Sequence, residues 1–427
     1  AGVVSQGQTA IRPEELRVEA RTIELGHADN QLSTLAFRAL GSEAVHGTAV
    51  ISSANGMTLG TVTNAIDGAL AGGQVTTAAS ASGSSFVDLN ARGGTFTLSE
   101  ALIAPSVRVA GAAIESGTPQ GRIQATEAGT HVVTLASTGN IGGVDSVDQA
   151  IRVQLADETT DDQVQILGGS SSPVALHLQG NGRTAQVDFG EVPNTGAVAL
   201  AADGDLTVDR SLEGFAQVTL SSVDGDVNLT TGSVSSQAIR IEALQGDING
   251  TAGLSSPQLD AQLVSLQAGG DIAATIDTSF LSVESQSNGG SVQLTNTGSG
   301  TLSVLSGLNL GGDFELTTAG APEVRAFSQG ALIQAQNVTL TAQGGITVGG
   351  GSMSMPLEVP MAVVPAPEGS AAIVATDTLT LNAGGALNLE GGTSAAHVAG
   401  EHVVINATSL SLTGGSSAGA YAAIQYG

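Results

Sequence analysis

Pairs of aliphatic residues separated by one residue recur along this chain, and between residues 203 and 313 a unit recurs that opens with a Gly-Asp or Gly-Gly dipeptide followed by such a pair. Leu206 and Val208 form one such pair, and Val227 and Leu229 form the next. Because side chains alternate between the two faces of a strand, each pair marks one face of a short β-strand. Measured at the residue before each strand, the steps are about 20 to 24 residues, a period typical of repeat proteins. The dipeptides begin at Gly204, Gly225, Gly246, Gly270, Gly289 and Gly312.

A second aliphatic pair follows about ten residues later in most units, as at Val218 and Leu220. No stretch of useful length shows helical periodicity. The pattern therefore predicts an all-β fold, a right-handed parallel β-helix (β-solenoid) of short strands with coils of roughly 20–24 residues. At ~4.8 Å between neighbouring strands, about 16 to 20 coils would form a rod of about 80 to 95 Å.

The repeat is regular in one region of the chain and less regular elsewhere. On this basis we predict that the chain divides into four regions. We expect an irregular solenoid at residues 1–120, regular repeats at 121–348, an excursion loop at 349–370 and C-terminal coils at 371–427. The excursion is rich in Pro and Met, and proline cannot donate a hydrogen bond to an internal ladder. It is either an exposed apolar contact loop or a loop folded back over the solenoid edge.

Composition excludes several classes of function. The chain has 427 residues, of which 39 are acidic and 12 basic, and its net charge is −27. All the basic residues are Arg, so there is neither a Walker-type phosphate loop nor a Schiff base, and the absence of Cys excludes thiolate chemistry. A surface with this much negative charge repels nucleic acid and acidic phospholipid. No stretch approaches the roughly 18 apolar residues of a membrane span, so we expect no nucleic-acid partner and no membrane-spanning segment.

Several repeat units resemble the shaft repeats of filamentous-haemagglutinin-like exoproteins. The units are Gly-Asp-Leu-Thr-Val at 204–208, Gly-Asp-Val-Asn-Leu-Thr at 225–230 and the run from Asn337 to Gly345, and the resemblance is clearest over residues 200–415. Members of that family are large bacterial surface proteins exported by two-partner secretion. The resemblance implies a secreted, cell-surface location and an outer-membrane transporter as partner during export. The Asn-Pro-Asn motifs of the family's secretion domain do not occur here, so the resemblance points to the shaft and carries over no functional residue.

Three functions follow as expectations, in order of preference. The first is a structural shaft or adhesin segment of a larger secreted bacterial surface protein, which mediates attachment or display. Flat rows of Thr, Ser, Asn and Gln on solenoid strands would suit a carbohydrate or cell-surface receptor. The second is a subunit of a self-assembling extracellular filament, because uncapped terminal coils favour end-to-end association. The third is a β-helix enzyme that degrades polysaccharides.

Three equally spaced aspartates are the candidate site. Asp205, Asp226 and Asp247 each open a repeat, so they are predicted to stack on successive coils. Unpaired carboxylates one coil apart repel each other, and a bound Ca²⁺ would relieve that repulsion. The simpler alternative is that each Asp accepts hydrogen bonds from turn amides and faces water. We otherwise expect no cofactor.

The enzyme alternative lacks the usual constellation of residues. A hydrolase needs two carboxylates, commonly beside aromatic residues that stack on sugars. Asp203 and Asp224 add carboxylates beside the aspartate column, but Phe215 is the only aromatic residue nearby. A lyase base would have to come from Arg210 or Arg240. We therefore predict that the chain is not an enzyme and has no catalytic residues.

Overall fold

The chain folds almost entirely into β-strands, as the alternation of aliphatic residues predicts. The computed structural model describes residues 2–41, 46–76, 85–144, 146–168, 172–190, 196–286, 290–327, 331–353 and 370–426. These residues form two compact units, the first made of residues 1–206 with 214–216 and the second of residues 207–213 with 217–427. Strands β21 (Leu206–Val208) and β22 (Leu212–Ser222) contain residues of both units.

Within the described residues, the first unit consists of strands and two single turns of 3₁₀ helix, η1 (Val147–Gln149) and η2 (Thr184–Gln186). Its strands are β1 (Val3–Ser5), β2 (Glu15–Ala20), β3 (Thr22–Leu25), β4 (Thr34–Leu40), β5 (Thr48–Ser52), β6 (Met57–Leu59), β7 (Thr61–Asn64), β8 (Gly68–Ala71), β9 (Gly73–Thr76), β10 (Phe86–Leu98), β11 (Leu102–Ala104), β12 (Ser106–Ser116), β13 (Arg122–Ala125), β14 (Val133–Ser137), β15 (Ile151–Gln154), β16 (Val164–Gly168), β17 (Val174–Leu178), β18 (Gly182–Arg183), β19 (Val187–Asp188) and β20 (Ala197–Ala202).

The second unit consists of strands only, in the part of it that the structure describes. They are β23 (Val227–Leu229), β24 (Val234–Ala243), β25 (Ile248–Asn249), β26 (Leu259–Ala268), β27 (Ile272–Ser285), β28 (Ser291–Asn296), β29 (Thr301–Thr318), β30 (Ala321–Phe327), β31 (Ala331–Ala342), β32 (Ile346–Met353), β33 (Ala371–Ala375), β34 (Thr378–Ala383), β35 (Ala386–Gly391), β36 (Ala396–Gly400), β37 (His402–Asn406), β38 (Ser409–Thr413) and β39 (Ala422–Tyr426).

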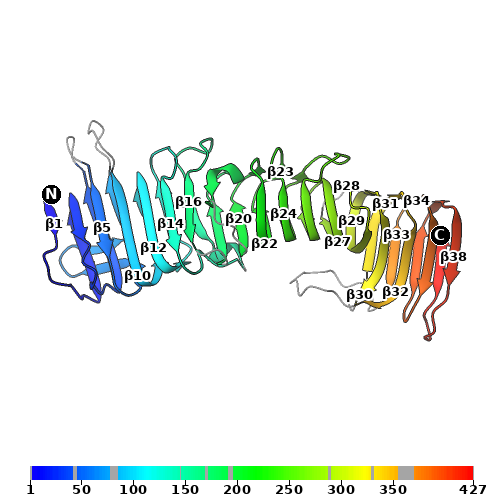
Figure 1. The fold of residues 1–427 in the computed structure, drawn as a ribbon, viewed down its shortest axis with the longest axis horizontal. Coiled ribbons are helices and arrows are strands. Elements are labelled where there is room, and N and C mark those ends of the chain that lie inside the picture. The colour runs from blue at the N-terminus through cyan, green and yellow to red at the C-terminus, as the bar shows by residue number, and fades with distance from the viewer. Residues whose placement is uncertain are drawn as a thin grey trace. The chain divides into compact units, whose positions relative to one another are not determined.

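In the first unit, the stacked strands pair parallel to their neighbours, and only the hairpin described below departs from this among the described strands. Strands β10, β12, β14 and β16 lie side by side (Figure 1), and Val87, Val107, Val133 and Val164 occupy one row across them. All four side chains are buried, as are those of the next inward row two residues further along. The prediction of an all-β fold with many parallel strands is therefore confirmed, and stacked aliphatic rows form its core.

The second unit has the same construction and contains the most regular spacing. Val227 pairs with Ile248 and Ile248 pairs with Ile272, so both steps fall within the expected period. The step from Val338 to its partner Leu379 is nearly twice as long, and the predicted excursion at 349–370 falls in this interval. Residues 354–369 of that excursion lie outside the described residues, so the two alternatives for the loop stay predictions. The four predicted part boundaries also stay predictions.

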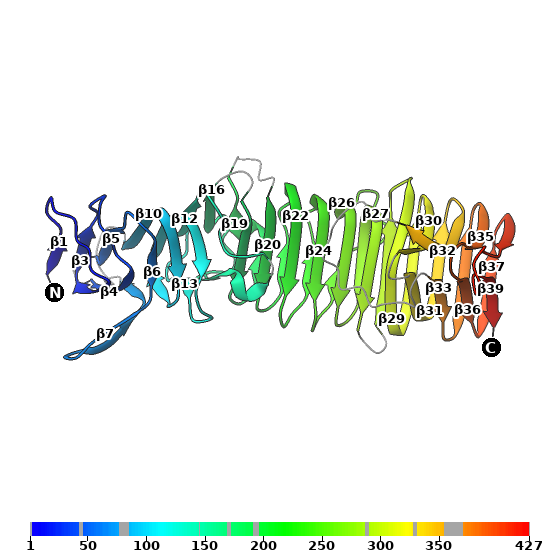
Figure 2. The same cartoon turned by 90° about the horizontal axis from the view of Figure 1, so that it is seen from below.

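One antiparallel hairpin interrupts the first unit, and the repeat pattern does not predict it. Strands β7 and β8 pair antiparallel, and Figure 2 shows β7 extending away from the stacked strands. Val62 and Leu70 of the hairpin are buried with Ala36 in a small apolar cluster of their own. Ile66 lies in the turn with 92 % of its surface exposed.

Candidate functional site

Two of the three predicted aspartates, Asp226 and Asp247, form a ladder of hydrogen bonds with Asp271 between successive repeats of the second unit, each of which is called a coil below. Oδ1 of Asp226 accepts the main-chain N–H of Asp247 at 2.8 Å, and Oδ1 of Asp247 accepts that of Asp271 at 2.7 Å. Oδ1 of Asp271 in turn accepts the N–H of Ser291 at 2.6 Å. Each carboxylate therefore binds the main chain of the next coil. Asp271 continues the ladder beyond the equally spaced aspartates, and equal spacing does not mark it because the step before it is longer.

At two of the Gly-Asp pairs, Gly246 and Gly270 leave room for the carboxylate of the preceding coil. A Cβ placed on Gly246 would lie 2.4 Å from Oδ1 of Asp226, and one on Gly270 would lie 1.8 Å from Oδ1 of Asp247. Neither glycine has a positive φ, so here glycine is needed for close approach rather than for its turn conformation. The Gly-Asp motif thus serves two coils, since its Asp binds the following coil and its Gly accommodates the preceding one.

Asp205, the remaining predicted Ca²⁺ ligand, belongs to the first unit. Its main-chain N–H donates to Oδ1 of Asn181 at 3.0 Å, which is the same contact made with an amide in place of a carboxylate. Asp203 and Asp224, which flank the predicted column, are exposed to solvent in whole or in part. Among the described residues, no group of three or more His, Cys, Asp or Glu residues could hold a metal ion. The column as a Ca²⁺ site stays a prediction, and the observed contacts favour the alternative role of binding amides.

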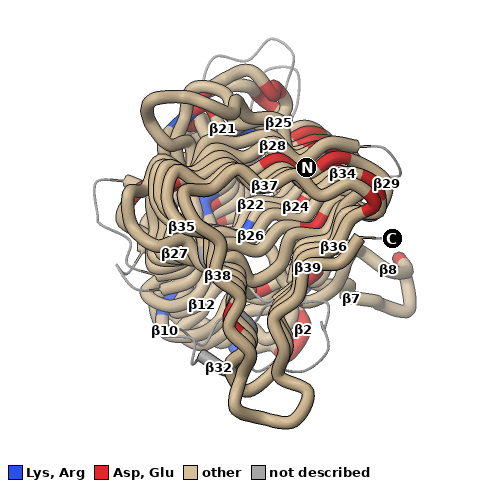
Figure 3. Tube along the Cα trace, turned by 90° about the vertical axis from the view of Figure 1, so that its right-hand side faces the viewer, with Lys and Arg blue, Asp and Glu red and all other residues tan. Residues whose placement is uncertain are grey.

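Figure 3 marks more acidic than basic positions on the trace, in keeping with the 39 acidic and 12 basic residues of the sequence. Arg240, one of the two suggested lyase bases, donates from Nε to Oε1 of Glu242 at 2.9 Å.

No helix in the described part of the chain is long and apolar enough to cross a bilayer.

A buried arginine and a buried histidine lie side by side in the first unit, and each contacts a more exposed aspartate. Arg152 on β15 pairs in register with His177 on β17, and both residues are buried. Nε2 of His177 lies 2.7 Å from Oδ1 of Asp203, and Nη2 of Arg152 donates to Oδ1 of Asp148 at 3.1 Å. Burial lowers the pKa of His177 below its ordinary value, although Asp203 acts in the opposite direction. Because the arginine and the histidine are enclosed, the cluster is a structural network rather than a site open to substrate.

A surface pocket opens beside this network, where the chain leaves the sheet between Ile141 and Ile151. Ile141 makes single bridges to Ile114 and Val174, and the chain rejoins the sheet at Ile151. Gly142 starts the excursion with a φ of +70°, and a Cβ there would lie 2.6 Å from the carbonyl oxygen of Ala175. Only glycine meets both conditions, so the Gly142-Gly143 pair is the local sequence cause of the pocket.

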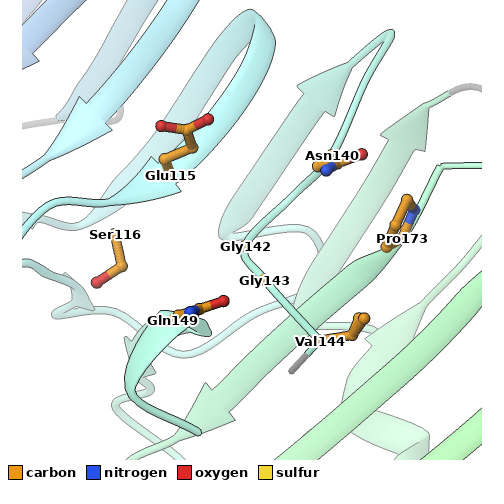
Figure 4. Close-up of a pocket in the computed structure, with 8 residues that line it drawn as sticks. All are labelled: Glu115, Ser116, Asn140, Gly142, Gly143, Val144, Gln149 and Pro173. Carbon is orange, nitrogen blue, oxygen red and sulfur yellow. The ribbon is translucent and has the colours of Figure 1, made fainter. Parts of the chain in front are cut away.

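The pocket has a volume of about 370 Å³ and a lining of mixed polar and apolar character. Figure 4 shows Glu115 and Ser116 on one side, with Asn140, Gly142, Gly143 and Pro173 across from them. Gln149 and Val144 complete the lining. No feature of the repeat pattern marks this pocket, because it depends on which distant strands Ile141 joins.

Comparison with known proteins identifies no relative of this chain. No protein-family model, no curated protein and no solved structure matches it.

Proposed function

We propose that the chain is a right-handed parallel β-helix that serves as a structural shaft or adhesin segment of a large secreted bacterial cell-surface protein. In this role it would carry load between the parts that it joins and would mediate attachment or display. The resemblance of its repeat units to filamentous-haemagglutinin-like shafts is the reason for proposing export through an outer-membrane transporter. A carbohydrate or a cell-surface receptor would be the partner in attachment.

The observation that carries this proposal is the double connection between coils. Each coil of a unit is bonded to the next through the strand ladders and, at the Gly-Asp turns, through the contacts from Asp226 to Ser291. A stack in which every layer is bonded mainly to its neighbours resists pulling along the stack, and its stability is a sum of similar local terms. The ladder carboxylates bind amides, which does not favour the enzyme alternative, since a hydrolase needs carboxylates free to act on substrate.

Stretching single molecules tests the load-bearing role. The full chain is held by its two ends between a surface and a force probe and then extended. We expect a series of force peaks, each releasing one coil, which corresponds to about 70 to 80 Å of chain for roughly 20 to 24 residues. Smooth extension without peaks, as for an unstructured linker, would contradict the proposal. Retention of beads coated with the chain on cells or glycan surfaces then distinguishes attachment from passive display.

A filament subunit is the second candidate, and one observation favours it. Leu410 and Leu412 of β38 continue the inward rows of Leu387 and Leu389, which are fully buried. Yet Leu410 and Leu412 are each 47 % exposed. A second copy that covered these rows would bury apolar surface and satisfy the open strand edge.

Sedimentation at several salt concentrations tests the filament. The net charge of −27 opposes contact at low salt, and charges are screened over a Debye length of roughly 10 Å at 0.1 M salt. Association through β38 should therefore grow with ionic strength, and Leu412→Glu should abolish it. Leu254→Glu, at a residue that is 40 % exposed elsewhere on the same unit, is the matched control. Association that weakens as salt is added would contradict this candidate.

A further inference from the structure

Three polar side chains of the pocket lining in the first unit are not used by the described part of the fold. The side chains of Glu115, Asn140 and Gln149 make no hydrogen bond or ion pair to a described residue, although all three line the pocket. Elsewhere in this fold, polar side chains at corresponding turns are used to bind the next coil, as Asp226 and Asn181 are. The pocket therefore holds donors and acceptors that the described part of the fold does not use.

The main chain of β12 adds an open edge to this set. Ile114 donates its N–H to Asn140 and accepts from the N–H of Gly142, so both its main-chain groups point toward the coil of Ile141. Because alternate residues of a strand point their main-chain groups the same way, those of Ser116 also point to this side. The chain has turned away at Gly142, and Ser116 therefore presents its main-chain groups to the pocket.

The charge of the lining selects the ligand. Glu115 is the one ionisable residue among the eight that line the pocket, and none of the eight is basic. Together with the net charge of −27, this carboxylate makes the pocket unfavourable for an anion and favourable for a cationic group. The amides of Asn140 and Gln149 each offer both a donor and an acceptor, which suits neighbouring hydroxyl groups. A volume of about 370 Å³ accommodates a ligand of one ring with its substituents.

We propose that this pocket binds an amino sugar, as a single hydroxylated ring whose ammonium group contacts Glu115 and whose hydroxyl groups contact Asn140, Gln149 and the main chain of Ser116. This inference goes beyond the shaft or adhesin role and does not depend on it, because a load-bearing chain needs no pocket. Val144 and Pro173 supply the apolar contact for the carbons of the ring.

Binding of four small probes tests the proposal on the full chain. The probes are glucosamine, glucose, glucuronate and cyclohexylamine, each added at millimolar concentrations while amide and side-chain resonances of the pocket residues are followed by NMR. Glucosamine should bind most tightly and should shift the resonances of Glu115, Asn140 and Gln149. Glucose lacks the charge and cyclohexylamine lacks the hydroxyl groups, so each should bind more weakly, and glucuronate should bind least.

Two variants with the same change of charge distinguish a direct contact with Glu115 in the pocket from the electrostatic field of the whole protein. Glu115→Gln should weaken glucosamine binding by a factor of about two to five, the range for a partly exposed ion pair, and should leave glucose binding unchanged. Glu127→Gln, at an exposed residue outside the pocket lining, should change neither. Gln149→Ala should weaken glucosamine and glucose alike. Equal binding of glucuronate and glucosamine, equal effects of the two Glu variants, or no shifts at the pocket residues would overturn the proposal.

Discussion

Oδ1 of Asp226 accepts a hydrogen bond from the main-chain N–H of Asp247 at 2.8 Å, so a side chain of one coil fixes the turn of the next. The relation repeats from Asp247 to Asp271, and the intervening Gly270 has no room for a side chain. A motif that looks like a turn signal in the sequence is therefore a connection between coils. Two predictions test the two halves of this motif.

The first prediction concerns the acceptor. Asp247→Ala removes the oxygen that binds the N–H of Asp271, and we expect the local free energy of opening to fall by about 1 to 2 kcal/mol. Hydrogen exchange of the Asp271 amide should then accelerate by about tenfold or more. Asp247→Asn keeps an Oδ1 acceptor and should show a much smaller effect. Equal acceleration in the two variants would mean that the carboxylate charge, and not the hydrogen bond, holds the turn.

The second prediction concerns the glycine. Gly270→Ala places a Cβ 1.8 Å from Oδ1 of Asp247, so the carboxylate must move, and we expect a loss of about 1 to 3 kcal/mol in the free energy of unfolding. In the double variant with Asp247→Ala the clash is absent, so its loss should be smaller than the sum of the two single losses. Gly300→Ala is the control, because a Cβ there meets nothing within 4 Å. Additive losses, measured by denaturant unfolding, would contradict the stacked arrangement.

The stacked core could be predicted from the sequence because its signal is local. Val107 and Val109 alternate with Arg108, and in the structure both valines are buried, while Arg108 faces outward with Nη1 3.7 Å from a carboxylate oxygen of Asp88. Alternation with a period of two fixes which face each residue takes, whatever the partner strand. Alternation does not say which strand is the partner. In the second unit the regular spacing between repeats predicts the partner strand.

The pocket and the buried charge network could not be predicted in this way, because both depend on irregular steps. Ile141 joins Ile114 and Val174 by single bridges, and no repeat signal places it there. His177 on β17 meets Asp203, which directly follows the paired strand β20, although neither residue belongs to a motif that would pair them. The Gly142-Gly143 pair was the one available signal for the pocket, and in a chain with 59 glycines it does not stand out.

The third prediction concerns calcium. Because Oδ1 of Asp226 and of Asp247 each accept a main-chain N–H, these carboxylates do not depend on a cation to relieve their repulsion. We expect that millimolar Ca²⁺, or its removal by a chelator, leaves the thermal unfolding midpoint unchanged. Mg²⁺ at the same concentration controls for screening by a divalent ion. A rise specific to Ca²⁺ that disappears in Asp226→Asn would instead support the predicted Ca²⁺ column.

The fourth prediction concerns the pH dependence of the first unit. Burial lowers the pKa of His177 in the folded chain, whereas in the unfolded chain the imidazole takes up its proton near the ordinary value of 6.5. Between the two pKa values the unfolded state binds more protons, so the free energy of unfolding decreases as the pH falls below 6.5. The groups facing the imidazole are Asp203, Arg152 and Asp148, and only the attraction of the two aspartates opposes this loss.

Urea unfolding between pH 7.5 and 5 measures this loss, and His177→Gln should reduce the slope because a glutamine does not titrate. Burial also lowers the pKa of His397 in the second unit, so the comparison uses a probe within the first unit, such as exchange of the His177 and Leu178 amides on β17. His402→Gln, at an exposed histidine, should leave the slope as it is. An exchange rate at β17 that does not rise as the pH is lowered, after correction for the intrinsic rate, would show that the Asp203 contact outweighs burial and that the pKa of His177 is not lowered.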